Sequence, residues 1–354
     1  MARYTPGHGG RGHELVDYPH AAEADAAFVR ATRAAGFEAD LAYAGLDDVD
    51  RIVDGLDADV VLNLCDGAGP GKDGLPGLEA IAALERRGLP YTGADAAFYG
   101  LGCDKVAMKA RFVAAGLPTP AGQCFRRSDE PLGAALAAAF PLFVKPSDSG
   151  GSAGVDLDSV VCDEPSLRGR LAALCPEFGE VLVEQYVDGR EVTVGIVDGP
   201  GGPRTLPPLE IAFGAAFPAG RGVRTFAAKY DPESPLYHGF ELLCPAPLGP
   251  RLERRVRALA LSAYRAVEGV GYGRVDLRLD AAHRPTLLEV NPNPSLEYAE
   301  TGFRDCAMLP IAAHVGGLPF DRLLRRLVAD GLRRGGRVQA VGATRRRSAR
   351  RTTA

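Results

Sequence analysis

Two neighbouring segments near the C-terminal end of the chain place the strongest constraint on its fold. The segment GRVDLRLD (273–280) alternates apolar and polar residues, and PTLLEVN (285–291) follows it after the loop 281–284. Such alternation is typical of a half-buried strand, and the short loop favours antiparallel pairing of the two segments. The chain is therefore expected to contain a sheet with one buried face and one polar face.

The register of this hairpin follows from the loop length. If pairing runs without interruption from the loop, Asp276 lies opposite Glu289 and Arg274 lies opposite Asn291. Leu287 is then expected on the same face, because it precedes Glu289 by two residues. The sequence thus predicts two carboxylates within contact distance of each other across the strand pair.

Opposed carboxylates indicate a cation between them. Like charges directly opposite each other destabilise a sheet, so Asp276 and Glu289 are expected to share a bound metal ion. Together with Asn291 they form an all-oxygen set, which suits Mg²⁺ or Mn²⁺ better than zinc. Neutralising either carboxylate should then not lower the stability of the metal-free protein. The alternative is a solvated, weakly repelling pair beside Arg274 and Arg278.

Lysine is scarce in this chain, and its positions are therefore informative. Of the 41 basic residues only five are lysines, namely Lys72, Lys105, Lys109, Lys145 and Lys229. A lysine kept against such an arginine bias is a candidate for a compact positive charge on a phosphate. Lys145 ends an apolar strand and precedes the loop 147–154, whose glycines let backbone N–H groups point at phosphate oxygens. A flexible surface loop is the alternative.

The rest of the chain indicates its organisation. Near the N-terminus the pattern predicts helices at 21–35 and 77–87 and strands at 37–43 and 58–64, a parallel α/β unit whose first strand is not visible. Further helices are expected at 102–115, 131–139, 252–267 and 318–332, and a strand at 141–146.

Two segments after the central strand carry predictions of their own. The dipeptide Asp188-Gly189 separates two strand-like runs, 181–187 and 191–197, which predicts a hairpin. Residues 198–250 are rich in glycine and proline, so they are expected to be irregular.

Composition excludes several classes of function. The net charge of −4 argues against a nucleic-acid binder, and no apolar run approaches the length of a membrane span. The N-terminus lacks the apolar core of a secretory signal. The seven cysteines are widely spaced and include no C-x-x-C pair, so neither a disulfide framework nor a zinc ribbon is expected. These observations favour a cytoplasmic protein.

The motifs, taken in order, resemble those of a known superfamily. Those that carry the resemblance are NLCDG, LPYTGAD, CDKVAMK, GLPTP, FVKPSDSGGSAGV, VLVEQYVDGREVTV, AAKYD, CPAPL, GRVDLRLD and LLEVNPNPSL. Over about residues 58–330 this set resembles the ATP-grasp superfamily and, within it, the D-alanine–D-alanine ligases. The resemblance implies a three-domain α/β architecture in which two α+β lobes grip ATP. The expected boundaries are an N-terminal parallel α/β domain at 1–94, a central ATP-grasp subdomain at 95–186, a C-terminal subdomain with the metal site at 187–335 and a disordered arginine-rich tail at 336–354.

The resemblance also implies roles for individual residues. The resemblance assigns to the ATP phosphates Lys105, Lys145 and the loop residues Gly150, Gly151 and Ser152. It assigns Lys229 to the transferred phosphate. Glu184 and the backbone of Tyr186 and Val187 are expected to bind the adenine, and Glu191 is expected to bind the ribose. The resemblance places Arg274 at the tetrahedral intermediate. It assigns to two Mg²⁺ or Mn²⁺ ions the ligands Asp276, Glu289 and Asn291. Ser295 is the catalytic candidate near the second substrate.

The implied reaction is an ATP-dependent, ADP-forming ligation of two small molecules, and a homodimer is the candidate assembly. A substrate carboxylate attacks the γ-phosphate to give an acyl phosphate, and an amine then displaces the phosphate. The substrate end departs from the family pattern: Gly151 stands where the family has its first loop serine, Asp66 replaces a histidine, and Glu300 stands near a serine that binds the second substrate's carboxylate. The sequence therefore favours divergent substrates. A true D-alanine–D-alanine ligase of peptidoglycan synthesis is the runner-up, and an inactive nucleotide-binding sensor or scaffold is a further alternative.

Overall fold

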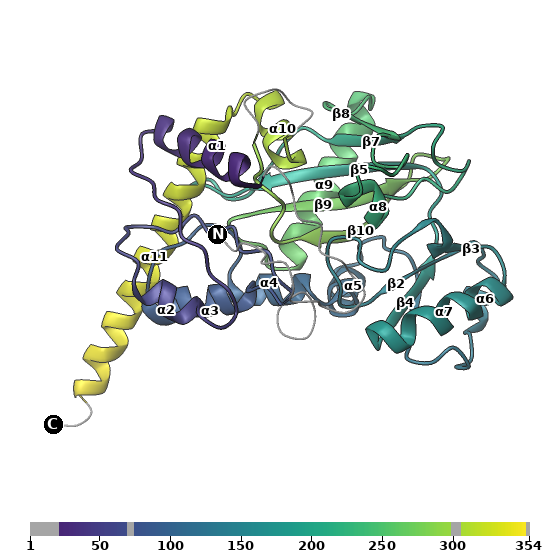
Figure 1. Cartoon of the computed structure of the whole chain (residues 1–354), viewed down its shortest axis with the longest axis horizontal. Coiled ribbons are helices and arrows are strands. Elements are labelled where there is room, and N and C mark those ends of the chain that lie inside the picture. The colour runs from purple at the N-terminus through teal and green to yellow at the C-terminus, as the bar shows by residue number, and fades with distance from the viewer. Residues whose placement is uncertain (1–20, 69–73, 299–305, 352–354) are drawn as a thin grey trace.

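The computed structural model describes residues 21–68, 74–298 and 306–351, and within these ranges it describes side chains from residue 24 to residue 336. Two antiparallel sheets, both drawn on the right of Figure 1, organise the chain after residue 121. The helix α11 (Phe320–Arg351) runs along the left side of the same view and contacts α1 (Ala21–Ala34). Helix α11 therefore continues through most of the segment 336–354, for which the sequence predicted disorder.

The N-terminal part is built mainly from helices. After α1 come α2 (Val49–Asp54) and α3 (Leu78–Arg87). Helices α1 and α3 agree with the helices predicted at 21–35 and 77–87, whereas no helix was predicted at α2. The prediction that residues 37–43 and 58–64 form strands is wrong. The described residues of these two segments form only a single parallel bridge, between Val61 and Tyr91. A strand forms only where a neighbour supplies hydrogen bonds over several residues, and here the pairing stops after one.

The smaller sheet has four strands in the order β1-β4-β2-β3. Their bounds are β1 (Gly122–Phe125), β2 (Leu142–Pro146), β3 (Val160–Val161) and β4 (Val181–Gln185). Helix α7 (Glu164–Phe178) packs on this sheet, because Leu167, Leu171 and Leu174 form one apolar stripe at helical spacing. The short helices α6 (Ala134–Ala137) and η1 (Leu157–Ser159) complete this part, whereas α4 (Ala96–Gly102) and α5 (Lys105–Ala114) pack against β10 (Pro285–Asn291) of the larger sheet.

The larger sheet has six strands, and its main path is β10-β9-β5-β7-β8. The bounds are β5 (Arg190–Val197), β6 (Arg204–Thr205), β7 (Leu209–Phe213), β8 (Phe240–Leu243), β9 (Tyr272–Leu279) and β10 (Pro285–Asn291). Helix α9 (Pro250–Ala266) covers one face, where its Val256, Ala260 and Tyr264 join a fully buried core with Val275 and Leu277. The opposite face is thereby left for polar side chains. Helices α8 (Phe226–Tyr230) and α10 (Met308–Val315) complete this part.

The predicted hairpin at Asp188-Gly189 is wrong. Strand β4 pairs with β1 and β2 in the smaller sheet, whereas β5 pairs with β9 and β7 in the larger one. Gly189 has a φ of +146°, and a Cβ placed on it would lie 1.9 Å from the carbonyl oxygen of Leu279. The dipeptide is therefore a crossing between two sheets, pressed against the end of β9, and only glycine fits there.

The prediction that residues 198–250 are irregular is also wrong, since β6, β7, β8 and α8 lie within this range. Each of these elements has at most five residues and lies between glycines and prolines. Such short elements gain their stability from the neighbouring strands, so their own sequence carries little periodic signal.

The predicted carboxylate register is confirmed. Glu289 pairs with Asp276, and Asn291 pairs with Arg274. Nearer the loop the register differs by one residue, because an irregularity between Leu287 and Glu289 shifts the pairing. Leu287 pairs with Leu277 and is fully buried, so the prediction that it shares the polar face of Glu289 is wrong.

All strands of the smaller sheet fall within residues 95–186, and all strands of the larger sheet fall within 187–335. The domain boundaries themselves stay a prediction. Among the described residues, no helix is long and apolar enough to cross a membrane.

Candidate functional site

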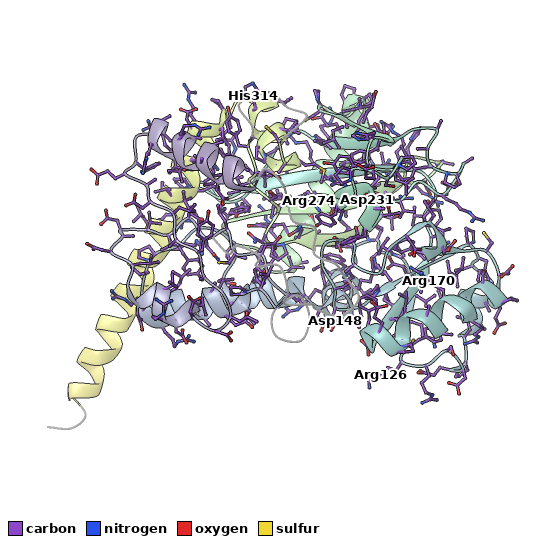
Figure 2. All side chains as sticks on the ribbon, viewed as in Figure 1. Arg126, Asp148, Arg170, Asp231, Arg274 and His314 are labelled. Carbon is purple, nitrogen blue, oxygen red and sulfur yellow. The ribbon has the colours of Figure 1, made fainter. Side chains whose placement is uncertain are left out.

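The polar face of β9 holds the centre of the site. Arg274 Nε lies 2.7 Å from Asp276 Oδ1, and Arg274 Nη2 lies 2.7 Å from Oδ2, so the guanidinium holds the carboxylate with two parallel hydrogen bonds. Residues two apart on a strand share a face, which allows this contact. Figure 2 labels Arg274 on the larger sheet and Asp148, in the loop after β2, on the other side of the site.

Glu289 lies opposite Asp276 and is surrounded by positive charge. Burial by itself would raise the pKa of Glu289, but nearby cations outweigh it and hold the pKa below its usual range. These cations come from four separate segments of the chain, and they are Lys105, Lys145, Lys229 and Arg274. The structure thus gathers three of the scarce lysines and the predicted arginine around one carboxylate.

Lys229 lies on α8, a helix that Thr225 caps by accepting a hydrogen bond of 3.0 Å from the N–H of Ala228. Burial, followed by the charges of Arg224 and Arg274, lowers the pKa of Lys229 to about 7. The described residues offer this amine no ion-pair partner. Above about pH 7 the charged form of Lys229 is therefore favoured only when an anion enters, as its predicted role at the transferred phosphate requires.

This shift predicts a pH dependence of nucleotide binding. Because Lys229 loses its proton as the pH rises through about 7, ATP binding above that pH must take up a proton. The affinity for ATP should then fall by up to about tenfold per pH unit between about pH 7.5 and about pH 9, where the triphosphate is fully ionised. Titration calorimetry measures this slope. The variant Lys229→Arg stays charged throughout, so its affinity for ATP should fall less steeply with pH, and an equal slope in both proteins would contradict the assignment.

The glycine- and serine-rich loop 147–154 follows β2 of the smaller sheet and contacts the segment just before α8. Gly151 has a φ of +60° and Ser152 a φ of +66°, so the backbone turns through the left-handed region at two successive residues. The Ser152 hydroxyl donates a hydrogen bond of 2.8 Å to the carbonyl oxygen of Arg224, just before α8. Lys105 donates from its amine to the carbonyl oxygen of Ser149 in the same loop. These contacts bring the predicted phosphate ligands of both sheets to one place.

Lys145 and Lys109 share one buried carboxylate. Lys145 Nζ lies 2.6 Å from Glu184 Oε1, and Lys109 Nζ lies 2.6 Å from Oε2. Burial would raise the pKa of Glu184, but the two ammonium groups lower it to about 2. Glu184 therefore stays charged and holds Lys145 in place, while its predicted adenine contact stays a prediction. Sequence reasoning gave Lys109 no role, although its scarcity and its position one helical turn after Lys105 were available signals.

A buried arginine organises the residues predicted at the adenine and ribose. Arg278 donates hydrogen bonds of 2.8 Å to Tyr186 Oη, 3.1 Å to the Val187 carbonyl oxygen and 2.8 Å to Glu191 Oε2, and it also donates to the carbonyl oxygen of Gly222. Its guanidinium also stacks over the Tyr186 ring at 5.0 Å. The sequence placed Arg278 on this face but gave it no such role.

The segment after β10 was assigned to the second substrate by the sequence. Ser295 is exposed, and its hydroxyl accepts a hydrogen bond of 3.0 Å from the N–H of Glu297, so nothing draws it into the charged cluster. Asn293 joins this end to the N-terminal part by donating to the Cys65 carbonyl oxygen at 3.0 Å and to Asp66 Oδ1 at 3.3 Å. Glu300 lies outside the described residues, as do Lys72 and the segment 1–20.

The donor set fits a hard cation. Asp276 and Glu289 face each other in register, and Asn291 follows on the same strand, which gives carboxylate and amide oxygens. Asn291 Oδ1 already accepts a hydrogen bond of 2.8 Å from the N–H of Asn293, and Arg274 occupies one lone pair on each oxygen of Asp276. Since each of these oxygens has a second lone pair, the three residues can still serve as ligands.

Comparison with known proteins gives one consistent family. The family model described as D-ala D-ala ligase C-terminus matches residues 112–329. The D-alanine–D-alanine ligase of Halorhodospira halophila is 35% identical over 87% of this chain and 90% of its own, and that of Oleidesulfovibrio alaskensis is 37% identical over 76% and 78%.

Solved structures agree. A D-alanine–D-alanine ligase from Bacillus anthracis complexed with ATP matches with a TM-score of 0.63 at 26% identity, over 82% of this chain and 84% of that chain. The ligase from Coxiella burnetii matches in fold with a TM-score of 0.64 at 20% identity, over 83% and 74%.

Proposed function

The chain belongs to the D-alanine–D-alanine ligase family of ATP-dependent ligases that form C–N bonds, and from this premise we propose that it joins an amino acid's carboxylate to a second amino acid's amine through an acyl phosphate. The likeness in fold confirms the ATP-grasp architecture that the motifs predicted. D-Alanine is the first substrate to test for both positions, because the relatives carry that name.

One observation supports this reaction above the others. Glu289 lies opposite Asp276 while cations from four segments surround it, so the site is built to hold negative charge against metal-binding oxygens. The resemblance assigns the phosphates to Lys105, Lys145 and Lys229. A ligase of this kind chiefly neutralises charge and aligns the reacting groups, which is what such a cluster provides.

Each chemical step has candidate residues in this chain. The substrate carboxylate attacks the γ-phosphorus, ADP leaves, and Lys229 with Lys145 would neutralise the transferred phosphoryl group. The amine then attacks the acyl carbon, and Arg274 would stabilise the negative oxygen that forms before phosphate departs. Asp276, Glu289 and Asn291 would hold Mg²⁺, which supplies positive charge to the phosphate oxygens when bound. A homodimer, a cytoplasmic location and the absence of nucleic-acid binding stay predictions.

The proposal is tested with a substrate panel. The purified protein is given ATP, Mg²⁺ and pairs of D- and L-amino acids or small acids, while ADP is measured enzymatically and products are identified by mass. ADP should form only when a carboxylate and an amine are both present, together with a product equal to the two substrates minus water. Retained ATP binding without turnover on any pair would favour the sensor alternative instead. Efficient formation of D-alanyl-D-alanine, faster than any other product, would establish the runner-up.

A further inference from the structure

The turn that follows β10 holds the side chain of one predicted metal ligand. It reads Pro292-Asn293-Pro294, and because proline has no N–H, Asn293 carries the one backbone donor of these three residues. That N–H donates a hydrogen bond of 2.8 Å to Asn291 Oδ1. The bond therefore fixes the oxygen of the Asn291 amide, and not its nitrogen, in this position and leaves the second lone pair for a cation.

Packing keeps this turn in place. Both prolines are buried, and Pro292 lies against the end of α4. A Cβ placed on Gly102 would lie 2.3 Å from Pro292 Cγ, so the helix and the turn are in direct contact. The N–H of Asn293 can then move away from Asn291 only if the turn itself rotates.

The side chain of Asn293 opposes such a rotation, because both ends of its amide are bonded. Its Oδ1 accepts a hydrogen bond of 3.2 Å from the hydroxyl of Tyr272, the fully buried first residue of β9. Its Nδ2 donates 3.0 Å to the carbonyl oxygen of Cys65 and 3.3 Å to Asp66 Oδ1. One side chain thus ties the turn to the larger sheet and to the N-terminal part of the chain.

The partner of Asn293 in the N-terminal part is itself firmly held. The N–H of Cys65 donates 3.2 Å to Oδ1 of the buried Asn63. Two residues after Cys65, the carbonyl oxygen of Gly67 accepts 2.9 Å from the hydroxyl of Tyr99. A Cβ placed on Gly67 would also lie 1.9 Å from a backbone oxygen, which leaves this segment no room to shift. The position of Asn293 is therefore set by a rigid neighbour.

We propose that Asn293 is a positioning residue for the metal site: its side chain anchors the turn, so that its N–H keeps the Asn291 oxygen available to bound Mg²⁺. The inference rests on the proposed function, in which Asp276, Glu289 and Asn291 hold Mg²⁺. This ion requires near-ideal octahedral geometry, so a ligand oxygen that can move binds it more weakly. Contacts behind a metal ligand commonly change metal affinity by about tenfold or more.

A Mg²⁺ titration read by thermal unfolding tests this role without turnover. Each protein is heated in saturating ATP with no other substrate, and we determine the Mg²⁺ concentration that raises Tm by a set amount above its metal-free value. Chelation of Mg²⁺ by ATP in solution is the same for every variant, so it cancels in the comparison. The Mg²⁺ concentration for half-maximal ADP formation is measured in parallel.

Asn293→Ala should raise both Mg²⁺ concentrations by roughly 10-fold, while kcat at saturating Mg²⁺ falls much less. This variant keeps the backbone N–H, so the change reports the loss of the side-chain anchors. Tyr272→Phe removes one of these anchors and keeps the packing of the ring. It should raise both concentrations by a smaller factor, and it serves if the alanine variant does not fold.

Arg257→Met is the control for a general loss of stability. Arg257 donates two hydrogen bonds of 3.0 Å to Thr205 and so ties α9 to β6 of the same sheet, and its loss should lower Tm without changing the Mg²⁺ requirement. Unchanged Mg²⁺ concentrations in Asn293→Ala and Tyr272→Phe, or an equal rise in Arg257→Met, would overturn the inference. If Mg²⁺ failed to raise the Tm of the wild type in ATP, the metal site and the proposed function would be contradicted instead.

Discussion

Replacing Lys145 with alanine is expected to lower kcat/KM for ATP by about a thousandfold while leaving the protein folded. Lys145 lies near the end of β2, just before the loop 147–154, and its charge contributes to lowering the pKa of Glu289. Removing it takes away a positive charge that is predicted to act on the phosphates. The fold should survive because Glu184, which loses one ammonium partner, keeps the other from Lys109. Steady-state ADP formation measures the loss, and circular dichroism measures folding.

Lys109→Met is the matched control for this variant. It removes the other ammonium from the same buried carboxylate at the same 2.6 Å separation, but Lys109 also contacts Thr119, away from the loop. We expect Lys109→Met mainly to lower the free energy of unfolding, with only a small loss of kcat. Lys145→Ala should mainly lower kcat, with only a small loss of unfolding free energy. Equal losses of kcat in the two variants would mean that the Glu184 network, and not contact with phosphate, explains the effect of Lys145.

Asp276→Asn and Glu289→Gln are each expected to raise the Mg²⁺ concentration needed for half-maximal activity by at least about tenfold, because each removes a charged ligand oxygen. Titrating Mg²⁺ at saturating ATP measures this requirement. A matched control is Glu191→Gln, which removes a buried carboxylate from the same sheet but is predicted to affect the nucleotide. An unchanged Mg²⁺ requirement in both carboxylate variants would exclude these residues as metal ligands.

The same two variants should also lower stability, which reverses the expectation from sequence. Opposed carboxylates alone predicted that neutralising one would not destabilise the metal-free protein. In the structure Asp276 instead neutralises the buried Arg274, so Asp276→Asn should cost on the order of 3 kcal/mol of unfolding free energy without metal. Glu289→Gln removes the carboxylate that several cations surround, so their mutual repulsion should also lower the unfolding free energy. Urea denaturation in a metal-free buffer measures both.

The carboxylate pair was predicted correctly from a register that is wrong next to the loop. Alternation in 273–280 and a short loop indicated a hairpin, but the strands pair one residue out of the predicted register until the irregularity restores it at Glu289 and Asp276. The irregularity near Leu287 could not be predicted, because either register buries apolar side chains next to the loop. The correct pairing at the site therefore depends on a local shift that the sequence pattern does not reveal.

The sequence pattern could not predict contacts between segments that are distant in the chain. Lys109 and Glu184 are far apart in the chain, as are Arg278 and Glu191, and each pair meets only in the folded chain, Arg278 and Glu191 as direct neighbours across β9 and β5. The crossing at Gly189 shows the same limit, since two strands joined by Asp-Gly satisfy the local rules of a hairpin while their actual partners lie elsewhere. Motif order assigned residues to the phosphates, and the structure adds the buried carboxylate Glu184 that Lys145 and Lys109 share.

The central claim, ligation through an acyl phosphate, is tested most directly by following one oxygen atom. A carboxylate substrate labelled with a heavy oxygen isotope is supplied with ATP, Mg²⁺ and the amine, and the released phosphate is analysed by mass spectrometry. If the carboxylate attacks the γ-phosphorus, one labelled oxygen must pass into inorganic phosphate for each peptide bond formed, with ADP as the other product. Unlabelled phosphate, or label found in AMP, would contradict this account.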